Sequence, residues 1–146
     1  MKGWFALPLA VAASGCDGFP RDSGGTLEQV RGRAFSVGRA DAPLPDPQLD
    51  RLIARLARRT DAQPAAVRGE AEWLLMRLEA GELDLVTGVF DENSPWARRV
   101  TFSRPVRTFT APGDGEVQAV AATRNGEHAW AMEVDRAVAD LTAGGS

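Results

Sequence analysis

The segment that most constrains the fold runs from Leu78 to Pro105 and reads LEAGELDLVTGVFDENSPWARRVTFSRP. Gly81 is placed to end a helix, and the following run Leu83–Val89 is apolar enough to form a buried strand. A polar loop comes next, then one turn of helix at Trp96–Arg99, then a second strand entered near Phe102. Such a unit fits a doubly wound α/β sheet, in which ligands bind at the carboxyl ends of the strands.

The rest of the chain alternates strand and helix patterns. Asp46-Pro47 is typical of a helix start, and the apolar stripe that follows it has helical spacing. Thr26 and Gln29 have the spacing of a capping box, and Asn125 is placed to cap the last helix. The strands expected elsewhere are 33–39, 65–68 and 117–122, with a turn at 112–115. Strands that alternate with helices predict a single three-layer α/β lobe with a mainly parallel sheet.

Composition narrows the class of protein. A length of 146 residues and a hydrophobic fraction of 44% fit one compact domain. The formal net charge of −3 gives no electrostatic case for binding nucleic acid. His128 is the only histidine, so no metal cluster and no acid–base pair can be assigned, and the residues do not predict an enzyme or a cofactor.

The N-terminus has the pattern of an export signal. Lys2 precedes the apolar run Trp4–Ala13, and small residues lead to the single cysteine, Cys16. This ending resembles a bacterial lipobox, which implies a lipoprotein signal peptide at 1–15, lipidation of Cys16 and a tether at 16–25. A cleaved secretory signal with an incidental cysteine is the alternative. In enteric-type bacteria, an aspartate such as Asp17 after the lipidated cysteine implies retention on the inner membrane, facing the periplasm.

The order of these pieces resembles family 3 extracellular solute-binding proteins of ABC transporters. The resemblance rests on the helix ending at Gly81, the strand after Asp84, the polar loop and the element FSRP at 102–105, and on GEHAW at 126–130. It covers residues 26–141 and implies the first lobe only, with the second lobe replaced by Thr110–Glu116. Residues 142–146 are expected to form a disordered tail. The implied partners are a small polar solute and an ABC transporter permease or another membrane protein.

The resemblance also implies where a ligand would bind. The candidate residues are Asp41, Gly88, Asp91, Glu92, Asn93, Ser94 and Trp96. Family members that bind amino acids clamp the ligand carboxylate with the pattern Thr-x-x-Arg, but those positions fall on Asn93 and Trp96, which do not match it. Each candidate also has a structural interpretation. Trp96 would pack, Asp91 and Glu92 would be solvated loop acids, and Asn93 and Ser94 would cap the following turn.

Two functions are therefore open. The first is a solute-binding or sensing lipoprotein that holds an amino-acid-like or other polar molecule in a truncated cleft. The second is an interaction module that uses the old ligand face to dock a protein partner or a second copy of itself. A concave polar pocket on that face favours the first function, whereas an exposed apolar patch of Phe90, Trp96 or Val106 favours the second.

Overall fold

The computed structural model describes residues 21–42, 46–113 and 115–144. The predicted signal peptide, the lipidation site Cys16 and the retention signal Asp17 lie outside the described residues. In chain order the elements are α1 (Thr26–Val30), β1 (Ala34–Ala40), α2 (Pro47–Thr60), β2 (Gln63–Gly69), α3 (Ala71–Glu79), β3 (Leu85–Asp91), the 3₁₀ turn η1 (Pro95–Arg98), β4 (Val100–Phe102), β5 (Arg107–Thr110), β6 (Glu116–Arg124) and α4 (His128–Ala143).

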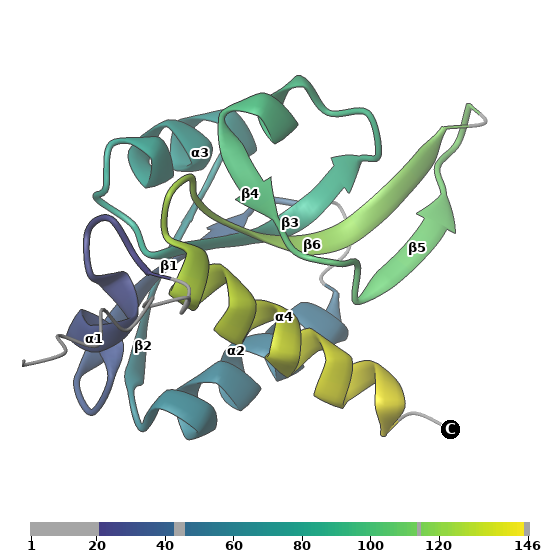
Figure 1. The fold of residues 1–146 in the computed structure, drawn as a ribbon. Helices are drawn as coiled ribbons and strands as arrows, with labels where there is room; N and C mark the ends of the chain where they lie inside the picture. Colours follow the sequence, from purple (N-terminus) through teal and green to yellow (C-terminus); the bar gives the residue numbers. More distant parts are fainter. Residues whose placement is uncertain (1–20, 43–45, 114, 145–146) are drawn as a thin grey trace, which may run out of the picture.

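The six strands form one sheet in the order β2-β1-β3-β6-β4, and β5 also pairs with β6 (Figure 1). β1 runs parallel to β2 and to β3. β6 runs antiparallel to β3, β4 and β5, so all strands except β6 point the same way. The predicted α/β lobe with a mainly parallel sheet is confirmed, and β6 is its one reversed strand.

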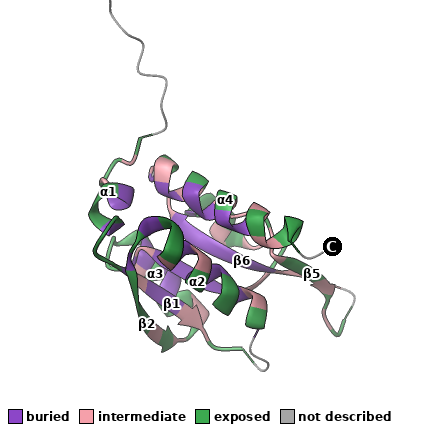
Figure 2. Cartoon of the chain, turned by 90° about the horizontal axis from the view of Figure 1, so that it is seen from below, coloured by how far each residue is buried: buried purple, intermediate pink, exposed green. Residues whose placement is uncertain are grey.

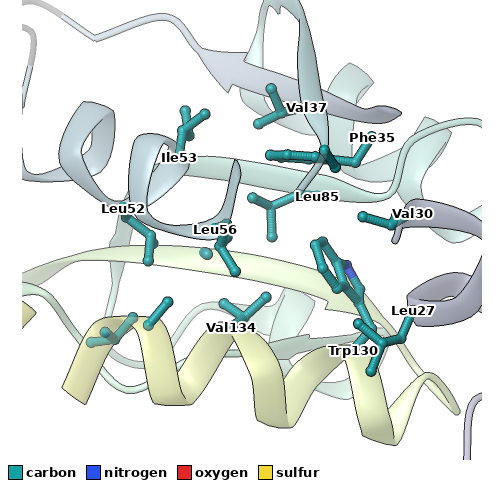
Figure 3. Close-up of a cluster of buried hydrophobic side chains, with 14 residues drawn as sticks. Leu27, Val30, Phe35, Val37, Leu52, Ile53, Leu56, Leu85, Trp130 and Val134 are labelled. Atoms are coloured by element: carbon teal, nitrogen blue, oxygen red, sulfur yellow. The ribbon is translucent and has the colours of Figure 1, made fainter. Parts of the chain in front are cut away.

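Helices cover both faces of the sheet, which gives three layers (Figure 1). α3 lies on one face and buries Leu74, Leu75 and Leu78 against the sheet. α1, α2 and α4 cover the other face, where Trp130 packs edge-on against Phe35 with ring centroids 5.9 Å apart (Figure 3). Both clusters are formed within residues 27–141, so a chain that begins at Asp17 contains every described residue of the core.

α2 shows how closely local sequence can set an element. The Asp46 carboxylate accepts a hydrogen bond from the Gln48 N–H at 2.9 Å, and Pro47 occupies the first helical position. The predicted stripe Leu49, Leu52, Ile53 and Leu56 is buried along its whole length. The left-handed residue Asp61 ends the helix.

The predicted caps of α1 and α4 are wrong. α1 begins after Gly25, without a side-chain cap from Thr26. Instead, one Asp22 carboxylate serves both helices: Oδ2 accepts from the Leu27 N–H at 2.7 Å and Oδ1 from the Trp130 N–H at 2.9 Å. Asn125 bonds Thr101, outside the helix start. For α4, a partner more than 100 residues away thus replaces the local one.

The chain passes directly from β5 to β6. The Ala111 N–H donates to the Gly115 carbonyl at 2.8 Å, which closes the predicted Pro-Gly turn. Figure 1 shows this hairpin extending beyond the helical layers. At the other end, α4 continues to Ala143, past the start of the expected tail at Thr142. No helix in the described part of the chain combines the length and the apolar character needed to cross a membrane.

Candidate ligand-binding cleft

The carboxyl ends of β1, β2 and β3 meet at one edge of the sheet. The register places Arg39 of β1 beside Arg68 of β2 on one side and Thr87 of β3 on the other. The Asp41 N–H donates to the Gly69 carbonyl at 2.9 Å, so β1 and β2 stay paired to their last residues. This is the edge at which α/β sheets bind ligands.

A small cleft opens at this edge, with a volume of about 60 Å³. Its lining includes Arg39, Asp46, Asp50, Arg68, Thr87 and Gly88. A water molecule occupies about 30 Å³ in the liquid, and sites that enclose small molecules measure about 300–1,000 Å³. A solute here would therefore rest on the surface of the cleft with one side in water.

The cleft carries charges of both signs. Arg39 forms an ion pair with Asp50. Asp46 is buried, and its second carboxylate oxygen, Oδ2, makes no hydrogen bond to any described residue, although Arg107 Nη2 lies 3.0 Å from it. Arg68 is exposed and forms no ion pair with the residues that the structure describes. Its guanidinium is therefore available to an anion.

Gly88 is the candidate residue that lines the cleft directly. A Cβ at this position would lie 2.9 Å from the Ala40 Cβ and 3.0 Å from the Phe90 ring, so the close packing of β1 against β3 requires glycine. Asp41 lies at the rim, exposed, between the lining residues Ala40 and Ala42. These two candidates share the cleft edge with Arg39 and Arg68.

The other candidates belong to the turn after β3 and do not line the cleft. Asp91 Oδ1 accepts from the Asn93 N–H at 2.8 Å, and Ser94 Oγ accepts from the Trp96 N–H at 3.4 Å. The Glu92 N–H donates to the carbonyl of Glu116 at 3.2 Å. These contacts hold the turn closed and cap η1.

Trp96 makes packing contacts. Its side chain is partly buried against the α3 cluster, and the Arg99 guanidinium lies 4.4 Å above its ring. Arg99 also bonds Glu79, with Nε 3.0 Å from Oε1.

Arg98 and Arg99 line a separate open hollow of about 580 Å³ with Arg124, at the end of β6, so neither faces the cleft. A third hollow of about 540 Å³ lies between α1 and α4.

The cleft charges were missed by sequence reasoning. These charges come from β1, from the start of α2 and from β2, and they belong to Arg39, Asp46, Asp50 and Arg68. None of the four lies in the polar loop of the Leu78–Pro105 segment. A signal was available, because Arg39 and Arg68 each end an expected strand and strand ends converge in a parallel sheet. Among the described residues, no group of three or more His, Cys, Asp and Glu side chains could hold a metal ion.

Comparison with solved structures shows which known proteins share this fold. Domain 1 of the T. maritima protein ArgBP, in an arginine-bound form, matches with a TM-score of 0.64 and 20% identity over 77% of this chain and 93% of that chain. The L-cystine solute receptor of Neisseria gonorrhoeae matches with a TM-score of 0.65 and 11% identity over 82% of this chain and 92% of that chain. The Salmonella typhimurium periplasmic binding protein STM4351, described as highly specific for arginine, matches with a TM-score of 0.62 and 10% identity over 76% and 94%.

The chain has the fold of one lobe of an amino-acid solute-binding protein. No protein-family model and no curated protein sequence matches it. At these identities the likeness establishes the fold, and the solutes named for the neighbours are theirs. The architecture expected from the Leu78–Pro105 segment is thus confirmed.

Proposed function

We propose that the protein is a periplasm-facing lipoprotein that binds a small zwitterionic solute of the amino-acid type on the open cleft of a single lobe. The observation that carries the proposal is the exposed Arg68 guanidinium at the strand ends, which forms no ion pair with a described residue and lines the same cleft as Asp46 and Asp50. The fork of donors on an arginine fits a carboxylate at two points. The ammonium group of such a solute would face Asp46 and Asp50, where it would share the carboxylates with Arg107 and Arg39.

The proposed site differs from the one that the motif predicts. By the resemblance, Trp96 falls at the position of the family's carboxylate-clamping arginine, and its side chain packs against the α3 cluster. Arg68 lies at the end of a neighbouring strand and supplies the same chemistry from another side of the cleft. The solved arginine-bound form of an isolated domain 1 supports the idea that one lobe can hold such a solute.

Affinity should be low, because a single lobe offers one wall. Enclosed sites bury about 70–90% of a ligand, and the exclusion of water strengthens their polar contacts. Without a second wall we expect dissociation constants near the millimolar range, which correspond to about −4 kcal/mol. Because binding is weak, the lobe would be occupied only where the local solute concentration is high. A partner in the membrane, either an ABC transporter permease or another protein, would then respond to that high concentration.

Isothermal titration of the chain that begins at Asp17 with arginine, glutamate, cystine and a neutral amino acid at up to ~10 mM tests the proposal. Arg68→Gln should weaken binding at least about tenfold, because it removes the charged donor. Arg98→Gln is the matched control, since Arg98 is an exposed arginine that lines a different hollow. Absence of heat with every solute, or equal losses in both variants, would contradict the proposed site.

Lipid anchoring is the second part of the proposal. It rests on Lys2, the apolar run Trp4–Ala13 and Cys16. A diacylglycerol together with an amide-linked chain gives the two lipid signals that stable anchoring needs. In bacterial cells, mass spectrometry should find a lipidated Cys16 at the mature N-terminus, and Cys16→Ser should move the protein out of the membrane fraction. A soluble wild-type protein that starts elsewhere would contradict the anchor.

The docking alternative gains no support on the old ligand face. Phe90 and Trp96 pack against the α3 cluster, and Val106 packs against the opposite cluster. None of the three is among the exposed large apolar side chains, which are Trp73, Met76 and Met132 in the described residues. An apolar interaction surface, if the protein uses one, must lie elsewhere.

A further inference from the structure

Among the described residues, β2 is the longest strand with an unpaired outer edge. β2 pairs with β1 along all seven of its residues, and no described strand lies on its other side. Its first four residues are exposed, which Figure 2 shows as green along this border strand of the sheet. An exposed strand edge is a ready template for pairing with another strand.

The backbone of β2 presents a regular set of outward groups. The Gln63 N–H donates to the Arg33 carbonyl at 3.0 Å, and the Gly69 carbonyl accepts from the Asp41 N–H at 2.9 Å, both toward β1. The direction of backbone groups alternates along a strand, so odd-numbered residues bond β1 and even-numbered residues face outward. Ala66 and Arg68 therefore each present an N–H and a carbonyl, and Pro64 presents a carbonyl alone.

The side chains beside this edge are apolar. Val67 and Gly69 face the α3 side of the sheet, and the Trp73 ring lies so close to Gly69 that a Cβ there would be 2.9 Å from it. Trp73 is 46% exposed, and Met76, one helical turn further, is 55% exposed. One of the three exposed large apolar residues in the described structure, Trp73, thus borders the free strand edge, and Met76 lies one turn along the same helix.

We propose that two copies of the chain pair through antiparallel β2 strands about a two-fold axis at Ala66, which joins their sheets into one. The two Ala66 residues would exchange both of their N–H···O bonds. Each Arg68 N–H would donate to the carbonyl of the partner's Pro64. Trp73 of one copy would then lie beside the α3 side of the other copy.

A second copy fits this edge because the edge is complementary to itself. Pro64 cannot donate, so in this register the Arg68 N–H gains the Pro64 carbonyl as its acceptor, while the Arg68 carbonyl receives no donor from the partner and stays open to water. Arg68 is the one charged residue of β2, and the two-fold axis keeps the two guanidiniums apart, each opposite a proline. No like charges face each other, and Ala65 meets the partner's Val67. A two-fold interface of this kind closes on itself and stops at the dimer.

Cysteine cross-linking tests the register. In a hydrogen-bonded antiparallel pair the Cα atoms are about 5.5 Å apart, within the range of about 4.4–6.8 Å that a disulfide spans. In the chain that begins at Asp17, which has no other cysteine, Ala66→Cys should therefore form an intermolecular disulfide under mild oxidation. Ala65→Cys is the matched control: it is equally exposed, but each Ala65 faces the partner's Val67, so it should remain reduced.

Sedimentation of the same chain measures the association. The wild type should dimerise, and Ala66→Pro should raise the dissociation constant at least about tenfold, because it removes the central N–H that does not bond β1. Urea unfolding should show that the Ala66→Pro monomer remains folded. A wild type that stays monomeric at ~100 µM overturns the proposal. So does a dimer that Ala66→Pro leaves intact, or a cross-link that forms equally at both positions.

Discussion

The two ends of the sheet treat their charges in opposite ways. At the end that holds the N-terminal segment, Glu127 is 2% exposed and accepts from the Gly24 N–H at 2.6 Å, the Thr26 N–H at 3.2 Å and Arg124 at 2.7 Å. At the cleft end, Arg68 is exposed without a partner among the described residues, and the Asp46 Oδ2 has no hydrogen bond. The first end satisfies its charges internally, whereas the second pairs Arg39 with Asp50 and Arg107 with Asp46 but leaves Arg68 without an ion pair among the described residues.

This difference separates stability from function within one small lobe. A buried carboxylate with several donors stabilises the fold, and its removal leaves those donors without a hydrogen-bond acceptor. An exposed charge at a cleft contributes little to folding and is free to bind. The following predictions test the contrast, beginning with the largest effect.

Glu127→Ala should lower the free energy of unfolding by about 3 kcal/mol, because Arg124 and two backbone N–H groups lose their acceptor. Urea unfolding followed by tryptophan fluorescence measures it. The control is Glu82→Ala, which removes an exposed carboxylate paired with Arg77 and should cost less than about 0.5 kcal/mol. Similar costs for the two variants would mean that burial does not distinguish these carboxylates.

Asp22→Ala should cost about 2 kcal/mol, since one carboxylate caps both α1 and α4 and each cap contributes about 1 kcal/mol. The same unfolding measurement applies. Asp61→Ala, at the left-handed end of α2, is not a suitable control because it changes backbone strain. Asp50→Ala is suitable, and a loss as large there as at Asp22 would refute the double cap.

Acid should weaken the Glu127 end. Burial raises the pKa of Glu127, but hydrogen bonds from Arg124, Gly24 and Thr26 outweigh burial, so the pKa lies below its usual value. The stabilisation is then complete above the unfolded pKa of about 4.3 and disappears as pH falls through the lower folded pKa. Unfolding between about pH 3 and pH 5 should depend on pH less steeply in Glu127→Gln than in the wild type. Parallel profiles would assign the acid sensitivity to other groups.

Arg39→Gln and Arg68→Gln should each change the free energy of unfolding by less than about 0.5 kcal/mol. Arg39 forms only a partly exposed ion pair with Asp50, and Arg68 forms none with the described residues. Thermal unfolding of both variants without solute measures this smallest effect. A loss above about 2 kcal/mol at either site would give the cleft arginines a structural role.

Elements set by adjacent residues could be predicted from the sequence. α2 is determined locally by Asp46, Pro47 and the apolar stripe that follows them. After α3 the chain turns at Gly81, which has a φ of 80°. The turn at 112–115 could likewise be read from its residues. In each case the residues that decide the structure are within a few positions of one another, so pattern and outcome agree.

Features set by distant residues could not be predicted. The cap of α4 comes from Asp22, and nothing near Asn125 indicates it. The reversed direction of β6 depends on its pairing with β3, β4 and β5, because the same apolar run would suit a parallel strand. The cleft charges meet only because the β1–β2 register places Arg39 beside Arg68. The motif around Asn93 and Trp96 led to a correct prediction of the fold. In the structure, however, these residues stabilise their own turn and do not line the cleft.

The position of β6 also affects how the protein can be made. This strand lies between β3 on one side and β4 and β5 on the other, and it is the last strand of the described sheet in chain order. During synthesis, β3 therefore has no partner on that side until β4, β5 and β6 have all left the ribosome. The closing pairs of the sheet, such as Val86 with Ala122, join residues that are distant in sequence, so they form late and leave the edge of β3 open to misassembly until then.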